Sequence, residues 1–208
     1  MYFDTKALIL SSRPAGEYDM LVRLLSADYG LLRSRLRGVR RATSRLKILK
    51  EPGVFADLHF WGRPSAEISQ LLTGVTLESF VGARDRWQRL CAVAGILAFA
   101  EAFTTPFDSR SKDKLALTLE CLGRLDGAKA NNANEEGLVL AYKLRFLDLS
   151  GWRFSVNDTA RFSLDAKMQN LCRAFEEGKW PAVEEEGFLR SVERAVDLYA
   201  DALRDKVT

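Results

Sequence analysis

The chain has 208 residues, of which 47% are apolar, 10% aromatic and 28% charged, and its net charge at pH 7 is +3. This composition is that of an ordinary globular protein, and it excludes a disordered chain and a strongly polybasic one. The longest apolar run, Leu90 to Ala100, is too short to span a membrane, which takes about 20 apolar residues. Because the N-terminus lacks a charged segment followed by a long apolar core, we expect a cytoplasmic protein.

The first part of the chain has the pattern of short strands separated by turn residues. The turn at Asp28-Tyr29-Gly30 predicts a hairpin between the second and third strands. The expected strands cover residues 7–10, 20–25, 31–38, 54–61 and 67–73. Five short strands in about 75 residues predict a small barrel, and the OB-fold is the common five-stranded barrel.

From residue 80 onward, the apolar residues recur at helical spacing. Asn134 is the expected N-cap of one helix, with Glu135 and Glu136 in its first turn. Helices are expected around residues 90–100, 111–126, 135–150, 164–177 and 188–206. The sequence therefore predicts an α+β protein, with a five-stranded OB-fold domain at residues 1–79 and an all-α domain at residues 80–208.

Positive charge is concentrated in the strand-rich part. Residues 1–79 hold 12 basic and 8 acidic side chains, whereas residues 80–208 hold 19 basic and 20 acidic ones. The segment 31–50 contains no acidic residue and eight basic ones, namely Arg33, Arg35, Arg37, Arg40, Arg41, Arg45, Lys47 and Lys50. Arginine predominates, and its planar guanidinium group binds phosphate oxygens in pairs.

The third strand arranges part of this charge in a line. Residues two apart in a strand point to the same side, so Arg33, Arg35 and Arg37 share one face at spacings of about 6.6 Å. This spacing is close to that of phosphates in an extended single strand. The alternative is an ordinary solvated sheet face, although such faces normally mix cations with anions.

The fourth strand carries aromatic residues on one face. Phe55, Asp57, His59 and Trp61 alternate with apolar residues, and exposed rings in such a row stack on bases. The alternative is that this face packs beneath the helical domain. Trp61, which lies near Arg63, is the ring expected to reach a base.

No catalytic arrangement is visible. His59 is the only histidine, no glycine-rich phosphate loop occurs, and the paired carboxylates lie at helix starts, where the helix dipole favours them. Cys91, Cys121 and Cys172 include no Cys-x-x-Cys pair, so we expect buried inert thiols and no metal site. We therefore expect a protein that is not an enzyme and takes no cofactor.

A series of short motifs occurs in a characteristic order. Ser12-Arg13 is followed by Glu17, by Gly30, by Arg37-Gly38-Val39-Arg40 and by Ser44; Pro52, a strand ending at Trp61-Gly62, and YKLRFLDLSGW at residues 142–152 come later. This ordered series resembles the RecO family of bacterial DNA repair proteins. The resemblance is closest over residues 5–80.

The resemblance implies an N-terminal OB-fold, a helical C-terminal domain and a non-enzymatic recombination mediator. Such proteins bind single- and double-stranded DNA, anneal complementary strands, and help RecA load onto coated DNA. The implied partners are RecR and the acidic tail of single-stranded DNA-binding protein, and the implied location is the bacterial nucleoid. Many relatives carry a four-cysteine zinc finger, but residues 153–170 contain no cysteine. We expect a short β-like segment at 153–162 in its place, and no basic extension after Thr208.

The predicted DNA-binding residues are the eight cations of the segment 31–50 together with Arg13, before it, and Trp61, after it. The full set is Arg13, Arg33, Arg35, Arg37, Arg40, Arg41, Arg45, Lys47, Lys50 and Trp61. Two other functions fit the same pattern. One is a protein-interaction adaptor whose helical domain docks partners and whose basic face receives an acidic peptide. The other is an RNA-binding OB-fold protein, because backbone contacts discriminate poorly between RNA and DNA.

Overall fold

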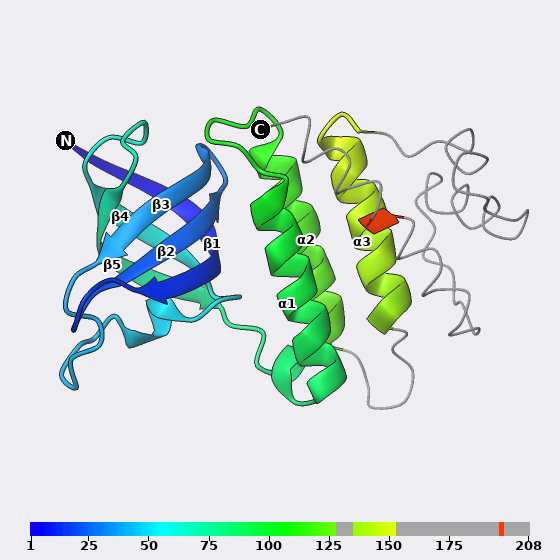
Figure 1. Ribbon diagram of the computed structural model, residues 1–208, viewed down its shortest axis with the longest axis horizontal. Helices are drawn as coiled ribbons and strands as arrows, with labels where there is room; N and C mark the ends of the chain where they lie inside the picture. The colour runs from blue at the N-terminus through cyan, green and yellow to red at the C-terminus, as the bar shows by residue number, and fades with distance from the viewer. Residues whose placement is uncertain (128–134, 153–195, 198–208) are drawn as a thin grey trace, which may run out of the picture. The chain divides into compact units, whose positions relative to one another are not determined.

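The structure is a computed structural model that describes residues 1–127, 135–152 and 196–197 (Figure 1). The chain divides into two compact units, residues 1–126 and 127–208. The segment expected at 153–162, the helix expected at 164–177 and most of the helix expected at 188–206 lie outside the described residues. The domain boundary between residues 79 and 80 stays a prediction.

The strand-rich part of the first unit is a closed five-stranded barrel with the strand order β1-β2-β3-β5-β4. The strands are β1 (Tyr2–Pro14), β2 (Met20–Ser26), β3 (Gly30–Leu36), β4 (Phe55–Trp61) and β5 (Ser69–Glu78). β3 and β5 are parallel, the other pairs are antiparallel, and β4 pairs back onto β1. This is the five-stranded OB-fold expected from the sequence, and the α+β class is confirmed.

β1 is longer than the expected strand at residues 7–10. Residues 2–8 pair with β4 and residues 7–14 with β2, with an irregularity between Ile9 and Ser11. Leu8, Ile9 and Leu10 are all buried, because the sheet faces the barrel interior on one side and α1 contacts β1 on the other. The apolar run at residues 7–10 therefore predicts only the segment of β1 that is buried on both faces of the sheet.

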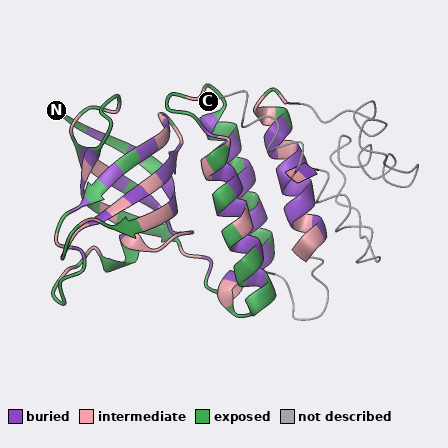
Figure 2. Cartoon of the chain, viewed as in Figure 1, coloured by how far each residue is buried: buried purple, intermediate pink, exposed green. Residues whose placement is uncertain are grey.

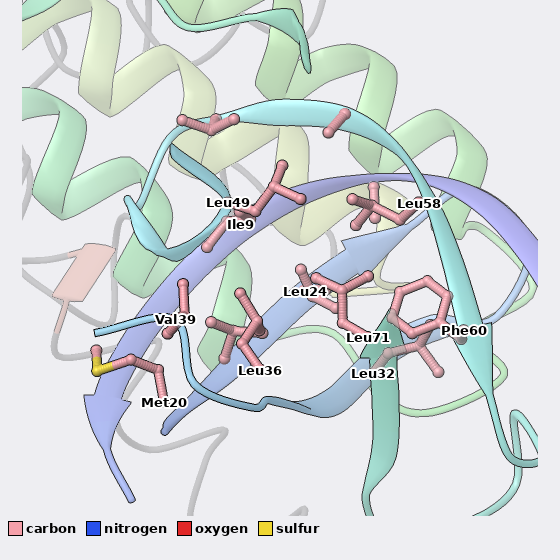
Figure 3. Packing of buried hydrophobic residues seen from close by; sticks show 14 of the residues in the cluster. Ile9, Met20, Leu24, Leu32, Leu36, Val39, Leu49, Leu58, Phe60 and Leu71 are labelled. Carbon is pink, nitrogen blue, oxygen red and sulfur yellow. The ribbon is translucent and has the colours of Figure 1, made fainter. Parts of the chain in front are cut away.

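Alternate strand residues fill the barrel (Figures 2 and 3). Leu24, Leu36, Leu58, Phe60 and Leu71 are at most 1% exposed. The short 3-10 helix η1 (Lys47–Lys50) adds Leu49 to the same core. Burial of each of these side chains stabilises the fold by about 1.5–3 kcal/mol.

Two helices complete the first unit, α1 (Trp87–Ala102) and α2 (Ser111–Gly127), after the short 3-10 helix η2 (Gly82–Arg84). The α1–α2 loop, residues 103–110, docks on the turn between β2 and β3. The Leu31 N–H donates to the Thr105 carbonyl at 3.0 Å, and the Phe107 N–H donates to the Tyr29 carbonyl at 2.8 Å. The Ser111 hydroxyl donates to the Ala27 carbonyl at 2.8 Å, so the β2–β3 turn is fixed by tertiary hydrogen bonds.

The described part of the second unit is α3 (Glu135–Leu149) with residues 150–152 and 196–197. Its first turn carries Glu135 and Glu136, as expected, while Asn134 lies outside the described residues. The helix ends at Leu149, and the positive φ of 81° at Gly151 allows the Trp152 N–H to reach the Leu147 carbonyl at 2.9 Å. Lys143 Nζ pairs with Asp197 Oδ1 at 2.8 Å.

The cysteine prediction is correct for Cys121 and wrong for Cys91. Cys121 is buried in α2, and this burial raises its pKa to about 12. Cys91 is exposed because it lies on the outer side of α1, whose opposite side is buried. Cys172 lies outside the described residues.

Over the described ranges, no helix has the length and apolarity of a membrane span. The same ranges contain no cluster of three His, Cys, Asp or Glu side chains placed to hold a metal ion.

Candidate nucleic-acid interface

The outer face of the β2–β3 hairpin carries a group of arginines. Ser26 pairs with Gly30, and this register places Arg23 opposite Arg33 and Leu21 opposite Arg35. Arg33 and Arg35 are exposed, whereas Leu32, Ser34 and Leu36 are buried, so the expected alternation along β3 is present. Arg37 is also exposed, one residue beyond the end of β3. We call Arg23, Arg33, Arg35 and Arg37 the arginine face.

Two acidic residues reach this face from distant parts of the chain. The carboxylate of Asp19, in the β1–β2 loop, accepts from Arg35 Nε at 2.8 Å and from the Gly38 N–H at 2.7 Å. The Gly38 hydrogen bond and then Arg35 lower the pKa of Asp19 below its usual value. Glu101 of α1 pairs with Arg23. Arg33, in contrast, forms no ion pair with any residue in the described ranges.

The start of the basic segment is held against the β1–β2 loop. The Arg40 N–H donates to the Tyr18 carbonyl at 3.0 Å, and Arg40 Nη1 donates to the Gly16 carbonyl at 3.2 Å. The Arg41 guanidinium lies 5.0 Å from the centre of the Tyr18 ring, a cation–π distance. These contacts place Arg40 and Arg41 beside the end of β3.

The remaining cations of the basic segment lie farther along the connection to β4. Arg45 is exposed, Lys47 Nζ donates to the Ala42 carbonyl at 2.6 Å, and Lys50 pairs with Glu51 at 2.7 Å. Only Arg33 and Arg35 of the eight cations lie within β3 itself. The eight charges therefore divide between the strand face and the connecting segment, where one is paired with a neighbouring acid.

Arg13 borders the arginine face from β1. It lies opposite Leu21 and lines a hollow of about 350 Å³. The hollow is lined by Ser11, Ser12, Arg13, Leu21, Val22, Arg23, Arg33, Glu67, Ile68 and Glu101. Residues from β1, β2, β3, the β4–β5 loop and α1 therefore meet beside the arginine face.

Trp61 lies on a different part of the barrel, at the end of β4. It is 51% exposed, so the alternative that this face packs beneath helices is wrong for Trp61. Phe55 and His59 point to the same side but are half-buried, and His59 pairs with Asp4.

Sequence reasoning missed Arg23, Asp19 and Tyr18. Arg23 was detectable, because a hairpin closed by the predicted turn at residues 28–30 places it opposite Arg33. Asp19 and Tyr18 carried the same signal, because the hairpin register that pairs Met20 with Leu36 places the residues just before β2 beside those just after β3.

A family model described as the N-terminal part of recombination protein O matches residues 1–80. These residues are a RecO N-terminal domain. The match covers the barrel and ends two residues beyond β5, so the resemblance to the RecO family is confirmed over this part of the chain. The match supports a general role in DNA recombination and repair.

The RecO domain presents its arginines where OB-folds bind their ligands. OB-folds generally bind oligonucleotides on the face of strands 2 and 3, between the loops that follow strands 1 and 4. In this RecO domain that region contains the arginine face, the β1–β2 loop with Tyr18 and Asp19, and the β4–β5 loop with Glu67.

Proposed function

We propose that this RecO-family protein is a non-enzymatic recombination mediator that holds DNA on the arginine face and brings complementary strands together. The observation that supports it best is Arg33, an exposed cation without an ion-pair partner among the described residues, on the ligand-binding side of an OB-fold. Arg33 also lies opposite Arg23, and Glu101 pairs with Arg23 but not with Arg33. Arg33 is therefore the member of this like-charged pair that a DNA phosphate would neutralise.

Backbone binding of this kind explains why one surface would serve both single- and double-stranded DNA. Contacts to phosphates carry no direct sequence information, and they neutralise the repulsion between two strands that must pair. We further propose that the protein acts with RecR, engages the acidic tail of single-stranded DNA-binding protein, and assists RecA loading in the bacterial cytoplasm. The family's role in recombination supports these partners.

The proposed contact is tested by Arg33→Ala combined with Arg37→Ala. Both side chains are exposed, so the double variant is expected to fold normally. Its affinity for a fluorescent single strand should fall about tenfold or more at low salt, because two phosphate contacts are lost. The slope of log K against log[salt] should fall by about 1.4, since each contact to a single strand contributes about 0.7. Fluorescence anisotropy over a salt series measures both quantities.

The matched control is Arg110→Ala combined with Lys112→Ala, which removes the same charge from the start of α2. This control should bind DNA as the unsubstituted protein does. Equal losses in the two double variants would show a general charge effect and refute the assignment of this face. Tighter binding of RNA than of DNA of the same sequence would favour an RNA-binding protein. Strand annealing with and without single-stranded DNA-binding protein then tests the mediator role.

Asp19→Asn should have the opposite effect on DNA binding. Asparagine keeps an oxygen that accepts from the Gly38 N–H but no longer neutralises Arg35. Single-strand affinity at low salt should rise a few-fold, and the salt slope should steepen by about 0.7 because Arg35 is free for one more phosphate. Because its pKa is lowered, Asp19 is ionised at every pH above the usual pKa of an aspartate. The difference in DNA affinity between Asp19→Asn and the unsubstituted protein should therefore persist from pH 5 to pH 8. Weaker binding by Asp19→Asn would contradict a phosphate-binding role for Arg35.

A further inference from the structure

A row of outward-facing side chains crosses the barrel at right angles to its strands. Backbone pairing connects Leu21 to Arg35, Arg35 to Gln70, Gln70 to Trp61 and Trp61 to Tyr2. The strand residues beside each member are buried, so all five side chains point outward. Paired strands lie about 4.8 Å apart, so along the curved outer surface of the barrel Trp61 lies two strand spacings and Tyr2 three strand spacings from Arg35. We call these five residues the cross-strand row.

The row ends in two large exposed rings. Trp61 is 51% and Tyr2 63% exposed. The Tyr2 ring is stacked on that of His59, with centroids 5.4 Å apart and an angle of 11° between the planes, and His59 is itself paired with Asp4. The contact with Asp4 holds the imidazole, and the imidazole supports the Tyr2 ring, so little side-chain entropy remains to be lost when a ligand stacks there.

The charges around the rings favour a nucleic acid over an apolar protein surface. Arg35 lies two strands from Trp61. Arg63 follows Trp61 by two residues, in the β4–β5 loop; it is exposed and forms no ion pair among the described residues. Asp4 contacts His59, Lys6 lies opposite Asp57, and Asp19 pairs with Arg35. Rings placed between cations are the combination that single-strand binders use, with stacking for bases and charge for phosphates.

We propose that unpaired DNA leaves the arginine face, crosses β5 along the cross-strand row, and stacks one base on Trp61 and another on Tyr2. This inference rests on the proposed DNA-binding function and adds a second contact region, on the β4–β1 side of the barrel. The rings can serve only unpaired bases, because the bases of a duplex already stack on one another. The row would therefore favour single strands, whereas the arginine face binds the backbone of either form.

The test is Tyr2→Ala combined with Trp61→Ala in the full chain, with anisotropy measured on three fluorescent probes. The probes are an oligothymidine, an abasic strand of the same length, and a duplex. Loss of a stacked base typically weakens binding by fivefold or more, so the double variant should bind oligothymidine at least 20-fold more weakly. Its affinity for the abasic strand and for the duplex should stay within about twofold of the unsubstituted protein. Tyr2→Phe combined with Trp61→Phe should restore most of the oligothymidine binding.

The control is Val75→Ala combined with Leu77→Ala, which removes two other exposed apolar side chains from β5 and should change no affinity. Unchanged oligothymidine binding in the ring variant, or equal losses on all three probes, would overturn the proposed stacking. The Arg33/Arg37 variant, measured in parallel, separates the two proposals. If the Arg33/Arg37 variant loses DNA affinity and the ring variant does not, only the stacking inference fails. If neither variant loses DNA affinity, the proposed DNA-binding function fails as well.

Discussion

Replacing Gly30 with alanine should destabilise the first compact unit by about 3 kcal/mol. Gly30 has a φ of +66°, a conformation that costs other residues about 1–3 kcal/mol. A Cβ at this position would lie 2.3 Å from the Thr105 carbonyl oxygen and 2.8 Å from the Asp108 nitrogen. Because both are backbone atoms, the β2–β3 turn and the α1–α2 loop would have to separate, which adds the cost of overpacking.

Urea denaturation measures this loss, and Gly16→Ala is its matched control. Gly16 also has a positive φ, +89°, but no heavy atom lies within 4 Å of the position of its Cβ. Gly16→Ala should therefore cost only the conformational strain, about 1 kcal/mol. Equal losses at the two positions would show that the close approach of the α1–α2 loop to Gly30 contributes nothing.

Removing the charge of Lys114 should also cost about 3 kcal/mol or more. Lys114 is only 2% exposed, and its ammonium donates to the Asp108 carboxylate and to the Phe103 carbonyl, each at 2.7 Å. Lys114→Met keeps most of the aliphatic stem but leaves a poorly hydrated carboxylate without its cation. Breaking a buried pair by removing one partner typically costs 3–5 kcal/mol.

A double-mutant cycle distinguishes loss of the ion pair from loss of packing. Lys114→Met combined with Asp108→Asn removes both charges, so the double variant should be more stable than Lys114→Met alone. Lys112→Met, at an exposed position two residues earlier, should change stability by less than about 0.5 kcal/mol. If the loss of stability in the double variant equalled the sum of the losses in Lys114→Met and Asp108→Asn, the pair would contribute no coupling energy.

Gly30 and Lys114 bear on the proposed DNA binding, because both contact the α1–α2 loop, which docks on the hairpin that carries the arginine face. Lys114 binds the two ends of the α1–α2 loop, and that loop contacts the turn at Gly30. α1 carries Glu101, which pairs with Arg23 on β2. The helices therefore set how much positive charge the arginine face presents.

Much of the barrel could be predicted from the sequence, because local rules govern it. Period-two alternation from Leu32 to Leu36 sets which arginines point outward, and the turn at residues 28–30 sets the hairpin that contains them. The change from strand to helix period near residue 80 likewise follows from local spacing. The length of β1 could not be predicted, because its two halves pair with different strands.

The sequence by itself determined the barrel, the outward direction of Arg33 and Arg35, and the excess of positive charge in residues 31–50. Only the tertiary structure decided which arginines of the arginine face are paired with an acidic side chain. Asp19 and Glu101 lie 16 and 78 residues from the arginines with which they pair. The pairing of β2 with β3 brings Asp19 within reach of Arg35, and the docking of α1 brings Glu101 within reach of Arg23. Closure also joins Arg35, Gln70, Trp61 and Tyr2 into one row. Ion pairing and stacking act over a few ångströms of space, so residues far apart in sequence meet only when the chain folds.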